Sequence, residues 1–234
     1  MSGHSKWATT KRKKEAVDAK RSSLFTKLAN VISIAARDGG DPTMNFKLRI
    51  AIDKAKTMSM PKDNIERAIK RGAGELGGNQ IEEIVYEGFG PDGIALVIEV
   101  VTDNRNRTSS EVKHILSKHG GNLGGPGTTM WMFEKKGVIT LDKESLTEAE
   151  ELSLIDLGIE DINQDGGITI YCPLDQFEEI KTKIENLNLP IMESGLEYVA
   201  KDQVAPPDEE KLIKLFEALD ENDDVANFYS NANL

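Results

Sequence analysis

Hydrophobic positions recur with a helical period through the first third of the chain. A stripe at 3.6-residue spacing runs through segment 24–40 and contains Leu24, Leu28, Val31, Ile32 and Ala35. It predicts a helix with Ser22 or Ser23 as N-cap and Gly39 just beyond its end. A second stripe, in 45–58, contains Leu48, Ala51, Ile52 and Ala55. Segment 61–72 predicts a third helix, with a capping box from Asp63 to Glu66.

After residue 80 the period changes to two. Segments 82–89 and 93–103 predict strands joined by the turn GPDG. A helix should follow over 108–120, with Thr108 and Glu111 as a capping box and Gly120 at its end. Segment 128–141 reads as one long strand or as two.

A second unit repeats this plan further along the chain. Helices are expected over 147–158 and 174–187, and strands over 166–172 and 194–200. After a break at APPD comes a last helix, 209–222, and a strand, 225–231.

The fold class that these elements predict is α+β with three domains. Residues 1–80 form an all-α helical bundle, and two α+β ferredoxin-like sandwich domains follow. Because 81–133 alone gives β-β-α-β, we expect the last helix and strand to complete it. The middle domain then comprises 81–133 plus 205–234, with 134–204 inserted as an acidic α+β domain. A simple tandem arrangement is the alternative.

Charge divides the chain. The net charge is −11, yet residues 1–80 hold 17 Lys+Arg against 8 Asp+Glu, while residues 81–234 hold 12 against 32. At physiological salt the Debye length is about 8 Å, so distant acids hardly weaken a basic segment. No apolar run is long enough to span a membrane, and no signal peptide is recognisable. The single cysteine, Cys172, fits a reducing compartment, so we expect a cytoplasmic protein.

Candidate catalytic chemistry is nearly absent, and we expect no enzyme, no metal and no cofactor. His114 and His119 are five residues apart on a predicted helix and do not form a ligand pair. Cys172 lies in a predicted strand, as a core residue would. The stretch GGNLGGPGTT lacks the lysine of a phosphate-binding loop. Adjacent acids such as Asp223 and Asp224 are expected to be solvated.

Basic residues and one tryptophan near the start of the chain predict contact with a polyanion. They are His4, Lys6, Trp7, Lys11, Arg12, Lys13, Lys14, Lys20, Arg21 and Lys27. Four consecutive cations repel one another, and phosphates would relieve that repulsion. Trp7 could stack on a base. The alternative is a disordered tail with Trp7 tucked against the bundle.

Two further groups of cations are candidates. Arg67, Lys70 and Arg71 share one face of the third predicted helix, which suits tracking a phosphate backbone and suits a solvated face equally well. Arg105 and Arg107 stand directly before the helix expected at 108. They would hold a phosphate or carboxylate there, or pair with acids of their own domain. We favour the pairing.

Several motifs resemble the YebC/PmpR family over essentially the whole chain. They are MSGHSKW, DAKR, FTKL, MPKDNIERAIKRG, YEGFGPDG, TDNRNRT, SKHGGNLG, WMF and YSNA. The resemblance implies a helical N-terminal domain with two α+β domains. WATTKRKK replaces the more usual WANIKHRK-like run, which keeps the basic character and loses a histidine.

The resemblance also implies a function in gene expression. Bacterial members of that family are known as DNA-binding transcriptional regulators. Mitochondrial relatives are translational activators, and some bacterial members resemble ribosome-associated factors that assist synthesis through proline runs. We therefore predict a nucleic-acid-binding regulator, with DNA or, in the alternative, ribosomal RNA as partner. No predicted helix carries a base-reading cluster, which favours backbone or shape recognition. The acidic domains offer a surface for a protein partner, although a purely protein-binding adaptor would leave the basic arm unexplained.

Overall fold

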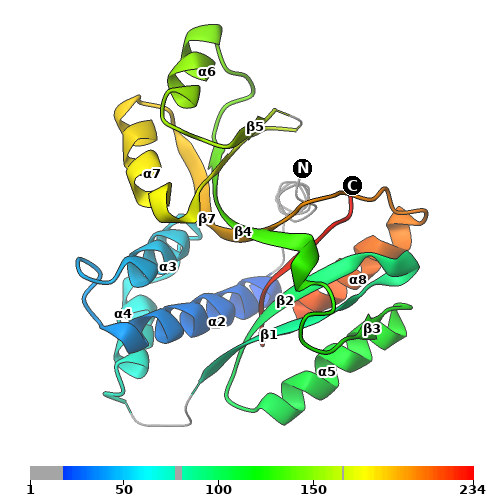
Figure 1. Ribbon diagram of the computed structural model, residues 1–234. Helices are drawn as coiled ribbons and strands as arrows, with labels where there is room; N and C mark the ends of the chain where they lie inside the picture. Colours follow the sequence, from blue (N-terminus) through cyan, green and yellow to red (C-terminus); the bar gives the residue numbers. More distant parts are fainter. Residues whose placement is uncertain (1–17, 77–80, 165) are drawn as a thin grey trace.

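The computed structural model describes residues 18–76, 81–164 and 166–234, with backbone alone for 18–22 (Figure 1). The chain is an α+β protein with an all-α N-terminal part followed by two α+β units. The helices of the first part are α2 (Asp18–Ala35), α3 (Phe46–Thr57) and α4 (Lys62–Gly72). The residues expected in its core are buried or half-buried there, and Ile65 and Ala68 of α4 join them.

The helix ends differ from the prediction in two places. Because α2 already includes Asp18, Ser22 and Ser23 lie inside the helix and cannot cap it. The helix α4 begins right after Pro61, so Asp63 lies in its first turn and the expected capping box with Glu66 does not form. The start of α3 is capped by Asn45, whose side chain accepts a hydrogen bond from the Leu48 N–H at 3.1 Å.

The first sheet has the strand order β3-β1-β2-β8. Its strands are β1 (Glu82–Phe89), β2 (Ala95–Thr102), β3 (Asn122–Leu123) and β8 (Val225–Ser230). As predicted, β1 and β2 form a hairpin around GPDG, where Asp92 and Gly93 have positive φ values of 58° and 76°. The strand β8 pairs antiparallel with β2, which is the pairing that the inserted arrangement requires.

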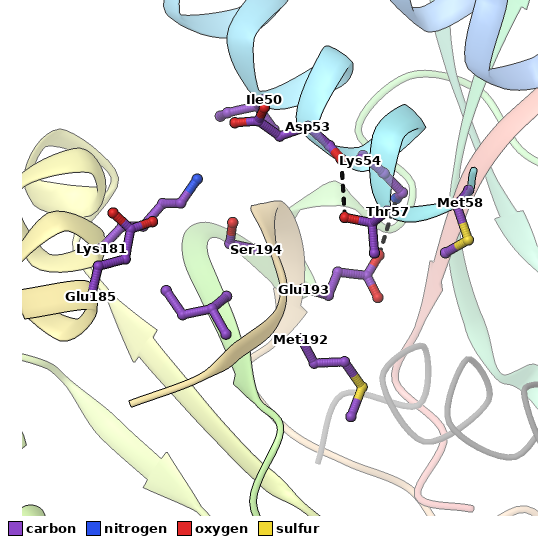
Figure 2. Close-up of a pocket in the computed structure, with 11 residues that line it drawn as sticks. Ile50, Asp53, Lys54, Thr57, Met58, Lys181, Glu185, Met192, Glu193 and Ser194 are labelled. Atoms are coloured by element: carbon purple, nitrogen blue, oxygen red, sulfur yellow. Dashed lines mark hydrogen bonds and ion pairs between the residues drawn. The ribbon is translucent and has the colours of Figure 1, made fainter. Parts of the chain in front are cut away.

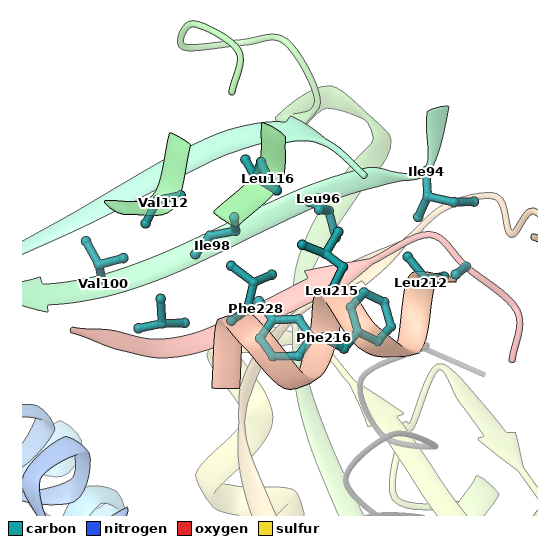
Figure 3. Close-up of a cluster of buried hydrophobic side chains, with 13 residues drawn as sticks. Ile94, Leu96, Ile98, Val100, Val112, Leu116, Leu212, Leu215, Phe216 and Phe228 are labelled. Carbon is teal, nitrogen blue, oxygen red and sulfur yellow. The ribbon is translucent and has the colours of Figure 1, made fainter. Parts of the chain in front are cut away.

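Helices α5 (Arg105–Lys118) and α8 (Glu209–Glu221) cover one face of the first sheet. Their apolar side chains meet those of β2 and β8 in one buried cluster (Figure 3). In this cluster Phe216 of α8 packs on Phe228 of β8, with ring centroids 5.0 Å apart. Two amphipathic helices on one face of an antiparallel sheet thus supply the core that the alternating strand pattern predicts.

The second sheet has the order β5-β6-β4-β7 and a β-α-β-β-α-β chain order. Its elements are β4 (Phe133–Leu141), α6 (Glu148–Ile155), β5 (Asp161–Asn163), β6 (Ile168–Cys172), α7 (Phe177–Asn186) and β7 (Ile191–Ala200). Segment 128–141, read as one strand or two, therefore gives a single strand in this sheet, and Met130–Met132 before it is a 3-10 turn. No helix within the described ranges has both the length and the apolar character needed to cross a bilayer.

Candidate nucleic-acid interface

Most of the basic arm lies outside the described residues. These positions are His4, Lys6, Trp7, Lys11, Arg12, Lys13 and Lys14. Lys20 and Arg21 lie on the first turns of α2, where the structure describes the backbone only. The role of all nine in binding a polyanion stays a prediction.

The exposed face of α4 carries the cations that the structure does describe. Arg67, Lys70 and Arg71 are all exposed, while Ile65 and Ala68 on the opposite side are buried. Within the described ranges, no carboxylate lies at ion-pair distance from any of these three cations. Arg71 donates a long hydrogen bond of 3.4 Å to the Asn30 side chain. The sequence-predicted trio is therefore one connected cationic surface, which we call the α4 patch.

Close packing against α2 fixes the orientation of the α4 patch. The hydroxyl of Ser33 is buried and donates to the Ala68 carbonyl oxygen at 2.9 Å. Gly72 allows the last turn of α4 to approach α2 directly, because a Cβ at that position would lie 2.1 Å from the Ser33 carbonyl oxygen. Glycine at position 72 therefore allows α4 to pack closely on α2, and it is also the last residue of α4, as predicted.

Lys27 was predicted to face nucleic acid, and the structure contradicts this. Its side chain is buried, forms an ion pair with Asp220 at 3.9 Å and donates to the Asp220 carbonyl oxygen. Ser23 nearby donates to Asp223 at 2.5 Å. The face of α2 that carries Lys27 is thus docked on the end of α8, so this lysine joins two parts of the chain.

Arg107 pairs with acids of its own domain, as the favoured interpretation predicted. Its guanidinium lies 2.7 Å from Asp224, 3.3 Å from Asp103 and 3.9 Å from Glu111. The hydrogen bond and charge of Asp224 raise the pKa of Arg107 above its usual value. Three carboxylates therefore lie around the Arg107 guanidinium, which leaves less of its charge for a phosphate.

The helix before which Arg105 and Arg107 were placed begins earlier than predicted. Asn104 caps α5 by accepting from the Arg107 N–H at 3.1 Å, so both arginines lie within the first turn. Thr108 is buried and donates to Asp224 at 2.6 Å, and the predicted capping box with Glu111 is wrong. Arg105 is exposed, and its carbonyl oxygen accepts from Tyr86.

Asp224 was expected to be a solvated acid, and this expectation is also wrong. Its side chain is 12% exposed and accepts hydrogen bonds from Thr108, Arg107 and Thr102. These donors come from β2 and α5, more than a hundred residues away in the chain. Asp224 therefore anchors the start of β8 to the helix α5.

Other cations of the helical part bind acids of the second sheet unit. Arg49 lies 2.8 Å from Glu178, and Lys54 lies 3.4 Å from Glu193. Between α3, α7 and β7 is a small cleft of about 200 Å³ (Figure 2). Its lining mixes charges of both signs, including Asp53, Lys54, Lys181, Glu185 and Glu193. Such a lining gives no field that would select an anion.

A buried carboxyl group lies on the same strand as Glu193. The Oε2 atom of Glu197 is buried and has no hydrogen-bond partner among the described residues. Burial raises the pKa of Glu197 to about 7, Lys54 opposes the rise, and Glu193 and Glu99 add to it. Glu197 is therefore a buried carboxyl group whose ionised form is disfavoured.

Other titratable side chains of the described residues lie outside these contacts. Cys172 is buried in the core, as predicted, and burial raises the pKa of its thiol to about 11. Burial lowers the pKa of His119, with a further contribution from Lys118. In the part of the chain that the structure describes, no three His, Cys, Asp or Glu residues gather as metal ligands.

Glu87 is a structural residue that sequence reasoning did not identify. Its buried carboxylate accepts from the backbone N–H groups of Gly127, Thr129 and Met130, at 2.6, 2.7 and 2.7 Å. Burial raises the pKa of Glu87, but the backbone hydrogen bonds together lower it by more than burial raises it. The pKa of Glu87 is therefore below its usual value. The only sequence signal is an acid in a strand beside a glycine-rich stretch.

Comparison with known proteins agrees with the motifs. Residues 5–75 match the profile described as TACO1/YebC protein N-terminal domain, and residues 81–232 match the profile described as TACO1/YebC second and third domain. A probable transcriptional regulatory protein of Thermoanaerobacter pseudethanolicus is 46% identical over 100% of this chain and 98% of its own length. One from Chlorobaculum tepidum is 47% identical over 100% of this chain and 96% of its own.

A solved structure shares the fold. The crystal structure of a conserved hypothetical protein from Aquifex aeolicus superposes with a TM-score of 0.84 at 44% identity, covering 93% of this chain and 92% of that one. The profiles and the relatives both span nearly the full length. The chain belongs to the TACO1/YebC family, which its sequence motifs resemble.

Proposed function

We propose that the protein is a non-enzymatic, nucleic-acid-binding regulator of gene expression that works in the cytoplasm as a DNA-binding transcriptional regulator. The name of its relatives, probable transcriptional regulatory protein, supports the regulatory role. The α4 patch is the observation that carries nucleic-acid binding. Its three cations are exposed on one face, and no described carboxylate neutralises them.

The patch favours backbone recognition over the reading of base edges. A recognition helix usually places its N-terminal residues in the major groove. The first turns of α4 instead carry Asp63 and Glu66, whereas Lys70 and Arg71 lie in its last turn. The same observation favours a second candidate function, a ribosome-associated translation factor that binds ribosomal RNA by shape.

Changing Arg67, Lys70 and Arg71 together to Ala tests the proposal. The matched control changes Lys56, Lys183 and Lys214 to Ala, which removes the same charge from exposed lysines that are already paired with acids. Binding to duplex DNA is measured over a salt series. Loss of three phosphate contacts should reduce the slope of log K against log[salt] by about 2.7. If the patch and control variants bind alike, the α4 patch is not the interface.

Sedimentation of cell lysate in sucrose gradients separates the two candidates. Co-migration with ribosomes that the patch variant loses and the control variant keeps would favour the translation factor. Absence from ribosomes, together with patch-dependent duplex binding, would favour the transcriptional regulator. The basic arm is tested in parallel by changing Lys11, Arg12, Lys13 and Lys14 to Ala.

A further inference from the structure

The glycine-rich loop between β3 and β4, residues 124–132, exposes a large aromatic side chain. Trp131 keeps 67% of its surface in water. Tryptophan is among the side chains that gain most from burial, so an exposed indole held in one orientation can contribute strongly to binding a partner. Its Nε1–H donates to the Thr128 carbonyl oxygen at 3.2 Å, which orients the ring.

The loop that carries Trp131 is held from three sides. The Glu87 carboxylate binds the backbone of Gly127, Thr129 and Met130. The Thr129 hydroxyl donates to the Leu96 carbonyl oxygen at 2.8 Å. Lys201 donates from its ammonium group to the Trp131 carbonyl oxygen at 2.9 Å. An indole presented on so fixed a backbone loses little conformational entropy when it binds.

One glycine of the loop is not explained by the fold. Gly127 has a φ of +82°, and a Cβ on Gly124 would lie within 3.0 Å of Thr128, so both need glycine. At Gly125 the φ is not positive and nothing lies within 4 Å of a Cβ position. The Gly125 carbonyl oxygen accepts a hydrogen bond from the hydroxyl of Thr128. The carbonyl oxygen of the same threonine accepts from the Trp131 indole. Bare backbone there allows a partner to approach closely.

A cation contacts the backbone of Trp131, through the Lys201 ammonium group and the Trp131 carbonyl oxygen. Lys201 is exposed, and no carboxylate of the described residues lies at ion-pair distance from it. It also lines a hollow of about 420 Å³ with Asn163 and Gln203. This hollow holds Glu134 and Asp161 as well, and its second lysine, Lys136, is bound to Glu134 and Glu160. Of the two lysines that line this hollow, Lys201 is thus the one that no described carboxylate neutralises, and it can bind an anion.

We propose that Trp131 is a base-stacking platform for single-stranded nucleic acid, with Lys201 contacting an adjacent phosphate. The inference rests on the proposed function and adds a second contact site, on the loop before the second sheet. An aromatic face accepts any base, and a neighbouring cation suits the backbone. A protein partner is less favoured because a tryptophan in a protein interface is usually ringed by other apolar side chains. Here Met130 and Met132, which flank Trp131 in the chain, are half-buried against the core, and the other exposed residues of the loop are Gly125, Pro126 and Gly127.

The test compares variants for binding to labelled single-stranded DNA and RNA 12-mers. Trp131→Ala should weaken binding about 5- to 150-fold, the range of base–aromatic stacking, and should leave the salt slope unchanged. Trp131→Phe should retain most of the affinity. Lys201→Ala should reduce the salt slope by about 0.7, as expected for one phosphate on a single strand. Leu152→Ala removes another exposed apolar side chain, on α6, and should have no effect.

Fluorescence gives an independent readout. The chain has two tryptophans, Trp7 and Trp131, so a Trp7→Phe protein reports Trp131 alone. Stacking should quench its emission on addition of the single strand. Unquenched emission during binding, with Trp131→Ala within twofold of wild type, would overturn the inference and leave the proposed function standing. Binding to duplex only would likewise overturn it, whereas binding to no nucleic acid would overturn both.

Discussion

Replacing Glu87 by Gln probes the buried hydrogen bonds that hold the Trp131 loop. The substitution preserves shape but exchanges one oxygen for an NH₂ group. In the best orientation of the glutamine, its amide oxygen still accepts hydrogen bonds from the Thr129 and Met130 N–H groups. Its NH₂ group then faces the Gly127 N–H, and two donors cannot bond to each other. Two hydrogen bonds lose their charge, at about 1 kcal/mol each, and one partly buried donor, the Gly127 N–H, is left unpaired, at about 1–3 kcal/mol. Since the neutral amide is easier to bury, we expect a net loss of about 2–4 kcal/mol.

The loss should depend on pH in a defined direction. The folded-state pKa of Glu87 lies below its ordinary value of 4.5, so the stabilisation is complete above that value. It disappears as pH falls through the lower folded-state pKa, because the wild-type carboxylate is then protonated as well. The difference between Glu87→Gln and the reference protein should therefore be constant from pH 6 to 8 and shrink below pH 4.

Urea unfolding of the Trp7→Phe protein measures this difference, with Trp131 emission reporting the loop and circular dichroism reporting the whole chain. Glu83→Gln is the control, because Glu83 lies on the same strand and is exposed. A loss below about 0.5 kcal/mol at pH 7, or an equal loss in both variants, would refute the role assigned to the Glu87 hydrogen bonds.

Two further substitutions test the packing between parts of the chain. Gly72→Ala should lower the free energy of unfolding by about 1–3 kcal/mol, because overpacking against Ser33 outweighs the helix preference of alanine. The control Gly40→Ala should change the Tm little, because the nearest atom to its added Cβ lies 3.5 Å away. A Tm unchanged in both variants would contradict the close approach of α4 to α2. Glu197→Gln should stabilise the protein by about 1–3 kcal/mol at pH 8 and little at pH 5, because a pKa raised from 4.5 to about 7 makes folding progressively less favourable as pH rises between those values. Thermal unfolding at the two pH values checks it, and an equal shift at both would contradict a buried carboxyl group.

The periodicity of apolar residues was enough to predict the helices and the longer strands, but not the short strands β3 and β5, nor where each helix is capped. The stretch TDNRNRTSS contains several residues able to cap α5, and local sequence favoured Thr108. In the structure Asn104 caps the helix, because Thr108 is buried against Thr102 and Asp224. Asp224 is far away in the chain, so local sequence does not reveal the competition for the Thr108 hydroxyl.

The same limit applies to the candidate site. Sequence shows the sign of each charge but not its partner, and the partners here are remote. Lys27 pairs with Asp220 and Arg107 with Asp224. Only the trio Arg67, Lys70 and Arg71 could be placed from sequence alone, because it shares one face of one helix.

These remote pairs bear on which cations can serve a polyanion. A lysine or arginine already bound to an acid contributes less to phosphate binding, since the pair must first be broken. Lys27, Arg49 and Lys54 join the basic helical part to the acidic remainder of the chain, so a phosphate that bound them would also loosen the contact between those parts. The α4 patch can meet a phosphate backbone without that cost. Among the described cations of the helical part, the footprint on nucleic acid should therefore centre on α4, and the opposite faces of α2 and α3 should remain docked during binding.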